Sequence, residues 1–399
     1  MQVRKTINTW DDWTDYFQMW RDDVGVEIPE AESFFMTPLY DDKPSSEVEF
    51  GDFAGDHKWD RIGQVPNQTM RDSLLQLVFV QGDTEFASTE QQRRLLDSVP
   101  HDYDRYAAVR IMLEEMRHGM QMANVLVNHF GSSGKLEARK LLERRASGAF
   151  PEEKNPRLLG AFNEAVDNWI DFYTYTCFVD RDGKYQLKML SPCGFSPLAR
   201  SAGPMLKEEA FHLGSGNDGL GRIIKAGKVP TGLLQKWFNK WISVATDLFG
   251  KDESSTAEWA YVWGFKSRFD EDEQRKAGNM DFNRKELNHH NRDLYHAEVT
   301  DLVNRLNKFV AEGQPLLYVP DIKFHRAIGR WANQPYSVTG ELLSEEEYQK
   351  HLQEVLPTEK DLAIVADIFK DPDWIQEKKI PNDPWAYQKA THAGTHNKA

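Results

Sequence analysis

Two stretches of the chain repeat one pattern of charged residues: LEEMRHGMQM at positions 113–122 and PMLKEEAFHL at positions 204–213. Each stretch contains Glu-x-x-His, and the residues concerned are Glu115 and His118, and Glu209 and His212. Residues three apart face the same side of an α-helix, so each pair directs a carboxylate and an imidazole toward one point. The apolar residues around both pairs recur at helical intervals, which predicts two core-facing helices.

One further carboxylate precedes each motif by roughly the length of a helix and a turn. Glu85 lies 30 residues before Glu115, and Asp180 lies 29 residues before Glu209. Both carboxylates continue the apolar stripe of their own segment, so both are expected to point inward. Four carboxylates and two imidazoles on four helices are typical of a two-metal centre in a ferritin-like bundle, and this ligand chemistry suits iron or manganese. The predicted ligands are Glu85, Glu115, His118, Asp180, Glu209 and His212.

Chance and simple charge pairing are the alternatives to a metal centre. Roughly one Glu-x-x-His is expected by chance in a chain this rich in Glu and His. A third copy, Glu286 to His289, lies on a polar stretch and is expected to be solvated. The neighbours Glu114 and Glu208 point away from the predicted ligands and are interpreted as supporting or exposed groups. Too few Arg or Lys face inward to neutralise six buried ionisable groups, and this favours a metal.

Two long helices are predicted in the first half of the bundle. The first runs from Asn67 to about Pro100, with apolar residues at three- and four-residue intervals. The second starts with Asp102 or Asp104 as its N-cap and stops before Gly131.

The second half of the bundle leaves two boundaries open. The third helix starts at about Leu158 and either ends at Gly183 or, as we favour, continues through it to about Leu190. The fourth begins either with Ser196 as N-cap and a kink at Pro204, or at Pro204 itself.

Beyond these helices the chain is expected to extend the bundle at both ends. Residues 1–66 are predicted to form an N-terminal wrapping segment, 67–312 the ferritin-like helical domain, and 313–399 a C-terminal extension packed on the bundle. Further amphipathic helices are expected at 233–248 and within 257–312. The fold class is therefore all-α, a four-helix bundle with additional helices and terminal extensions.

Composition narrows the possible functions. The 399 residues include 49 basic and 63 acidic side chains, and the net charge of −14 argues against nucleic-acid and anionic-membrane partners. The first residues contain no apolar signal region and no long apolar run follows, so a cytoplasmic protein is expected. Cys177 and Cys193 are too few for a thiolate cluster.

The sequence motifs around these residues resemble those of the oxygenase component of benzoyl-CoA 2,3-epoxidase, a family of ferritin-like di-iron enzymes of aerobic aromatic degradation. The resemblance covers about residues 50 to 350. It rests on QGDTEFASTEQQRRLL (81–96), LEEMRHGMQM (113–122), RLLGAFNEAVDNW (157–169), FVDRDGKYQL (178–187), PLARSAGPMLKEEAFHL (197–213) and FHRAIGRW (324–331).

The resemblance implies a di-iron centre on the six residues named above and a substrate contact at Gln81. It implies that two ferrous ions activate O₂, and that one oxygen atom adds across the 2,3 bond of benzoyl-CoA to give 2,3-epoxybenzoyl-CoA. A separate NAD(P)H-dependent flavin and iron–sulfur reductase would supply electrons, because the chain contains no dinucleotide fingerprint. Phe86, in place of proline, and Gly203-Pro204 depart from the family pattern near the cavity wall.

Other functions share some of these features. A di-iron oxygenase or N-oxygenase acting on another substrate would have the same ligands, and a ferritin-like metal-binding protein without turnover would share the fold. Cationic contacts for the phosphates of an acyl-CoA are sought at Arg93 and Arg94 or in 135–145, although such residues usually form a solvated helix face.

Overall fold

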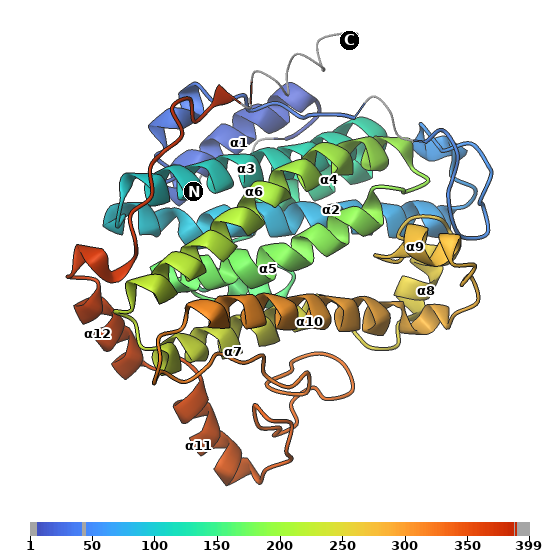
Figure 1. Cartoon of the computed structure of the whole chain (residues 1–399). Helices are drawn as coiled ribbons and strands as arrows, with labels where there is room; N and C mark the ends of the chain where they lie inside the picture. Colours follow the sequence, from blue (N-terminus) through green and yellow to red (C-terminus); the bar gives the residue numbers. More distant parts are fainter. Residues whose placement is uncertain (1–5, 42–44, 387, 389–399) are drawn as a thin grey trace.

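The computed structural model describes residues 6–41, 45–386 and 388, and within these ranges the chain forms helices, with isolated β-bridges in place of strands. Figure 1 shows long helices side by side at the centre of the molecule. The predicted all-α, ferritin-like bundle with additional helices is confirmed. The α-helices are α1 (Trp10–Val24), α2 (Gln68–Gln92), α3 (Asp102–His129), α4 (Gly131–Glu143), α5 (Trp169–Leu190), α6 (Ser196–Ala226), α7 (Thr231–Asp247), α8 (Ser255–Val262), α9 (Glu271–Lys276), α10 (Leu287–Leu306), α11 (Glu345–Val355) and α12 (Glu359–Ile368). Short 3-10 turns occur at Pro29–Glu32, Ile62–Gln64, Arg93–Ser98, Gly160–Asn163, Arg284–Glu286, Asn307–Phe309 and Pro372–Trp374.

The bundle consists of two helical pairs. α2 packs along α3, α5 packs along α6, and α3 contacts α6 where the pairs meet. Glycines permit the close approach within each pair: a Cβ at Gly119 would lie 2.5 Å from the Phe86 ring, and one at Gly219 would lie 2.0 Å from the Tyr173 ring. In the described part of the chain, α2 and α5 contact each other much less than α2 contacts α3 or α5 contacts α6. A space can therefore form between α2 and α5.

The first pair follows its local sequence signals closely. Asn67 caps α2 by accepting a hydrogen bond from the backbone N–H of Met70 at 3.0 Å. The helix tolerates Gly82 and ends at Gln92, where a 3-10 segment takes over. α3 spans Asp102–His129 and stops before Gly131, as predicted, with His101 rather than an aspartate at the N-cap.

The start of the third bundle helix differs from the prediction. α5 begins at Trp169, not at about Leu158, and Asn168 caps it by accepting hydrogen bonds from the backbone N–H groups of Ile170 and Asp171. The preceding segment is held away from helical geometry by the neighbouring helix α2. Buried Arg157 pairs with Glu90 at 2.7 Å, so tertiary contacts override the apolar spacing.

Both remaining alternatives in the second pair are decided in favour of the longer helix. α5 continues through Gly183 to Leu190, as favoured, because glycine in a helix interior costs only about 1 kcal/mol relative to alanine. α6 begins at Ser196, with Phe195 at the N-cap position, and continues through Pro204. The motif at its centre is therefore carried by one helix.

The other helices cover the outside of the bundle. α1 lies against α3 and α4, α7 and α10 lie against α5, and α11 contacts α7. One large apolar cluster extends from Ile7 to Ile375, so segments before and after the bundle contribute to the same core. The division at residues 66 and 312 stays a prediction.

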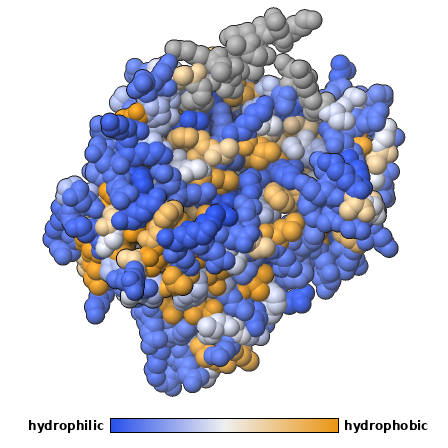
Figure 2. Space-filling view, in the orientation of Figure 1, coloured by the Kyte–Doolittle hydropathy of each residue, from blue (hydrophilic) through white to orange (hydrophobic). Residues whose placement is uncertain are grey.

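The visible face is mostly hydrophilic, with apolar residues in scattered patches (Figure 2). None of the helices in the described ranges combines the length and the apolar character needed to cross a bilayer.

Candidate metal centre

Five of the six predicted ligands meet at the middle of the bundle. Ligand atoms of Glu85, Glu115 and His118 lie within 4.8 Å of one another, and so do those of Glu115, Glu209 and His212. All five side chains are buried. Glu115 belongs to both groups, and this is the arrangement that a carboxylate bridging two cations requires.

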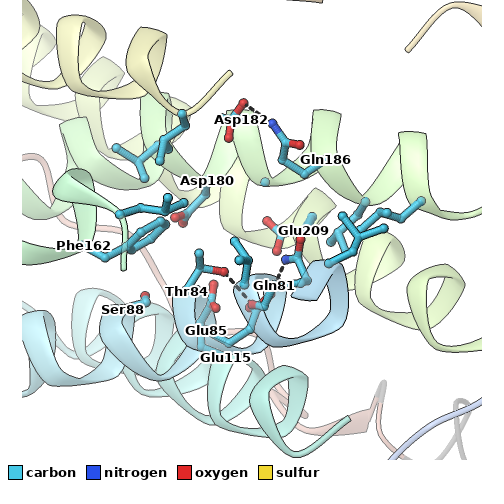
Figure 3. Close-up of a pocket in the computed structure, with 18 of the residues that line it drawn as sticks. Gln81, Thr84, Glu85, Ser88, Glu115, Phe162, Asp180, Asp182, Gln186 and Glu209 are labelled. Carbon is cyan, nitrogen blue, oxygen red and sulfur yellow. Dashed lines mark hydrogen bonds between the residues drawn. The ribbon is translucent and has the colours of Figure 1, made fainter. Parts of the chain in front are cut away.

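Asp180 is the predicted ligand that lies outside both groups of three. Its side chain is buried, and it lines the same cavity as Glu85, Glu115 and Glu209. An aspartate is one methylene shorter than a glutamate, so its carboxylate stays nearer to its own helix. Asp180 therefore faces the cluster from the edge (Figure 3).

The two histidines are oriented by carboxylates of the opposite helical pair. The Nε2 of His118 lies 2.9 Å from Glu208, and the Nε2 of His212 lies 3.0 Å from Glu114. Glu114 and Glu208 are thus buried supporting groups, the first of the two roles expected for them. A hydrogen bond at Nε2 leaves Nδ1 as the metal-binding atom of each neutral ring.

The Nδ1 atoms point into the cluster. For His212 this atom lies 3.2 Å from Glu115 and 3.4 Å from Glu209, and for His118 it lies 3.5 Å from Glu85. Both imidazoles therefore face the carboxylates that would share a metal with them.

Buried arginines are more numerous than the sequence indicated. Arg117 pairs with Glu208, Arg157 with Glu90, and Arg222 with Asp104, so inward-facing cations exist, but the carboxylates that they neutralise are not the predicted ligands. Among the described residues, the predicted carboxylate ligands form ion pairs with the two histidines.

The electrostatics of the cluster call for added positive charge. Burial and the charge of Glu85 raise the pKa of Glu115 well above its usual range, and burial and the charge of Glu209 do the same for Asp180. Burial alone would lower the pKa of His118, but the adjacent carboxylates of Glu208 and Glu85 raise it well above its usual value. A bound cation would relieve the repulsion among the carboxylates.

Several buried atoms of the cluster have no hydrogen-bond partner in the described chain, although buried polar atoms normally have one. They are the Nδ1 atoms of His118 and His212, Oδ2 of Asp180 and Oε2 of Glu209. Imidazole nitrogen and carboxylate oxygen are donors that iron and manganese accept. The residues present therefore fit a dinuclear metal centre.

A cavity of about 200 Å³ opens beside the cluster, between α2 and α5. Its apolar lining includes Leu77, Val80, Phe162, Leu187 and Leu190. Gln81 also lines it and donates a hydrogen bond of 2.6 Å to Glu85, so it faces the predicted substrate space and positions a ligand at once (Figure 3).

Six polar residues that line this cavity were not predicted from the sequence: Thr84, Ser88, Tyr175, Asp182, Gln186 and Lys266. Burial, together with the charges of Asp180 and Glu115, raises the pKa of Tyr175 well above its usual range. The helical phase of Tyr175 and Asp182 could have indicated them, but nothing local relates Lys266 to this site.

The remaining sequence candidates have structural partners elsewhere. His289 of the third motif lies 3.5 Å from Asp293 and is partly exposed. Arg93 donates to the backbone oxygen of Val24, and Arg145 pairs with Asp23 at 2.6 Å.

Comparison with known proteins gives two results. Residues 62–278 match the family described as phenylacetic acid catabolic protein. The chain is also 33% identical to benzoyl-CoA oxygenase component B of Aromatoleum evansii, in an alignment of 414 positions that covers 88% of this chain and 87% of that protein.

Proposed function

Because the chain belongs to the phenylacetic acid catabolic protein family, we propose that it is a di-iron monooxygenase of aerobic aromatic degradation. Its proposed reaction is the epoxidation of benzoyl-CoA to 2,3-epoxybenzoyl-CoA, with O₂ as the oxidant. The name of the relative that covers most of the chain supports this substrate.

The observation that carries the proposal is the pair of buried ligand groups that share Glu115 beside a cavity. Glu85, Glu115 and His118 would hold one iron ion, and Glu115, Glu209 and His212 the other. Asp180 would complete the set from the cavity edge. Two bound ferrous ions would supply the electrons and the Lewis acidity that O₂ activation needs.

The residues around the ligands hold them ready for metal. Glu208 and Glu114 fix the ring orientation of His118 and His212 through Nε2. Gln81 holds the Glu85 carboxylate in the same way. Such supporting hydrogen bonds raise metal affinity because the ligands need not reorganise on binding.

The cavity suits the aryl end of the substrate. An engineered apolar cavity of about 150 Å³ binds benzene, so the space of about 200 Å³ beside the carboxylates can hold one aromatic ring. Leu77, Val80 and Phe162 would cover the ring and keep bulk water from the reacting carbons.

Electrons are proposed to come from a separate NAD(P)H-dependent flavin and iron–sulfur reductase. The name of the relative, component B, belongs to a system with more than one component. Both cysteines of this chain are buried single thiols on or next to α5, and an iron–sulfur cluster normally needs four thiolates.

The proposal is tested with iron-reconstituted protein, a competent reductase, ¹⁸O₂ and benzoyl-CoA. We expect about two iron ions per chain and a CoA product that carries one labelled oxygen atom. Glu115→Ala is the matched control and should form no product. Bound iron without any oxygenated CoA product would defeat the reaction proposed here, and oxygenation of an arylamine or another thioester instead would identify a different oxygenase of the same centre. Absence of bound iron after reconstitution would defeat the metal assignment.

A further inference from the structure

A chain of three polar side chains crosses the rim of the cavity, which is otherwise mostly apolar there. Lys266 donates a hydrogen bond to the side-chain oxygen of Gln186, and the amide of Gln186 donates at 2.9 Å to Asp182. Asp182 and Gln186 lie on α5, on the cavity side (Figure 3). All three line the cavity, as do the predicted metal ligands Glu85, Glu115, Asp180 and Glu209.

The backbone holds Lys266 in place at this rim. It follows α8, and its N–H donates to the carbonyl oxygen of Ala260 at 3.1 Å. The next residue, Ser267, donates from its backbone N–H to Met189 of α5 at 3.0 Å. The backbone of Lys266 is therefore anchored to α8 and α5, and the hydrogen bond to Gln186 directs its ammonium group toward α5.

Lys266 has hydrogen-bonding capacity that the described chain does not use. An ammonium group carries three N–H donors, and one of them is bonded to Gln186. The cavity lining also includes Leu187, Leu190 and Leu248, which offer no side-chain acceptor. Burial lowers the pKa of Lys266, and the charge of Asp182 opposes this shift.

We propose that Lys266 is a substrate-binding residue that donates a hydrogen bond to the carbonyl oxygen of an acyl thioester whose aryl group fills the cavity. By holding this oxygen at the rim, Lys266 would determine which ring carbons face the carboxylate cluster. The inference rests on the proposed function, because it assumes an aryl-CoA substrate.

The charge balance of the rim favours a neutral acceptor over a free carboxylate. Asp182 lies on the same hydrogen-bonded chain, so an anionic ligand would gain from Lys266 and lose to Asp182. A thioester carbonyl needs a donor without bringing a second negative charge. The free aromatic acid is accordingly expected to bind less well than its thioester.

The test compares two ligands that differ at this oxygen. Benzoyl-CoA has the carbonyl, and S-benzyl-CoA has a methylene group in its place, with the same ring and the same CoA. Hydrogen bonds to charged groups are worth about 1.5–3 kcal/mol, so the wild-type protein should bind benzoyl-CoA about 10- to 150-fold more tightly under anaerobic conditions. In Lys266→Met this ratio should fall to about 1, and Lys266→Arg should restore part of it.

Lys188→Met is the matched control, because Lys188 lies on α5 over the Phe269 ring and outside the cavity lining. It should keep the wild-type ratio. Equal binding of the two ligands by the wild-type protein, which needs no variant to fold, would overturn the inference, as would an unchanged ratio in Lys266→Met. In those cases iron binding and turnover of benzoyl-CoA would leave the proposed function intact. If the wild-type protein neither binds nor oxidises benzoyl-CoA, the proposed function fails first and the inference falls with it.

Discussion

The first helical pair, α2 with α3, and the second, α5 with α6, offer the same kinds of ligand but hold them differently. Each imidazole is supported by a carboxylate of the other pair, His118 by Glu208 and His212 by Glu114. Neither pair could therefore orient its own histidine alone. The ligand geometry of the centre therefore depends on the packing of the two pairs against each other. Each pair by itself would carry histidines whose rings are not held in the metal-binding orientation.

The two lone carboxylates mark the main difference between the pairs. Glu85 accepts a hydrogen bond from Gln81 and lies within reach of His118. Asp180 has Thr176 in the position corresponding to Gln81, and its Oδ2 has no hydrogen-bond partner in the described chain. The carboxylate of Asp180 is thus held by fewer hydrogen bonds than that of Glu85.

Removing the shared carboxylate should have the largest effect. Glu115 belongs to both ligand groups, so Glu115→Ala is expected to reduce bound iron from about two ions per chain to almost none. Asp180→Ala removes the carboxylate outside both groups and should retain at least half of the metal. Metal analysis after anaerobic reconstitution measures both, with circular dichroism as the check on folding. Equal iron content in the two variants would show that the pairs do not differ as described.

Metal removal should weaken the folded state more at high pH than at low pH. The folded-state pKa values of Glu115, Asp180, His118 and His212 are raised, so their protonated forms stabilise the metal-free fold at acidic pH. That stability is lost as the pH rises through the raised values. A metal at 100-fold excess over its Kd would stabilise the fold by about 2.7 kcal/mol.

Thermal unfolding with and without Fe²⁺, under anaerobic conditions at pH 6 and pH 8, measures this difference. The gain in melting temperature should be larger at pH 8. A gain that shrinks with rising pH would contradict the view that metal neutralises repulsion between the two pairs.

Substitution of the two supporting carboxylates should have similar effects on metal affinity but different effects on the stability of the fold. Glu208→Gln and Glu114→Gln are each expected to lower metal affinity about 10- to 100-fold. Glu208→Gln should also lower the stability of the fold, because it removes the negative charge that pairs with Arg117, which is 2% exposed. Glu114 pairs with Arg110, which is less buried. Metal titrations measure the affinities, and chemical denaturation measures the stabilities of both variants. Equal stability losses would contradict the expectation that Glu208→Gln destabilises the fold more than Glu114→Gln.

The smallest effect is expected at the rim of the second pair. Asp182 has Ala87 as its counterpart in the first pair, two residues after the lone carboxylate. Burial raises the pKa of Asp182 from 3.8 to about 7, so the folded state loses stability relative to the unfolded state as the pH rises from about 4 to 7. Asp182→Asn removes this penalty.

The melting temperature of Asp182→Asn should therefore exceed that of the wild type by a margin that grows between pH 5 and pH 8. Asp301→Asn, at an exposed position of α10, controls for the loss of one negative charge. A constant margin across this range would argue against a buried, titrating Asp182.

Local sequence signals predicted much of the bundle. Asn67 as a cap and the apolar stripe after it placed α2, and the stop before Gly131 placed the end of α3. The start of α5 was missed because Arg157 and the segment after it bind α2 through long-range contacts. The cap at Asn168, directly before Trp169, was the local signal that could have located it.

The sequence by itself determined which ligands share a helix face, because a three-residue spacing places Glu115 and His118 together in any α-helix. Only the tertiary structure decided that each histidine is held by the opposite pair, that Asp180 stays at the edge of the cluster, and that Lys266 reaches the cavity rim. Those contacts join residues about 80 or more positions apart, and helical periodicity carries no information about which helix packs against which.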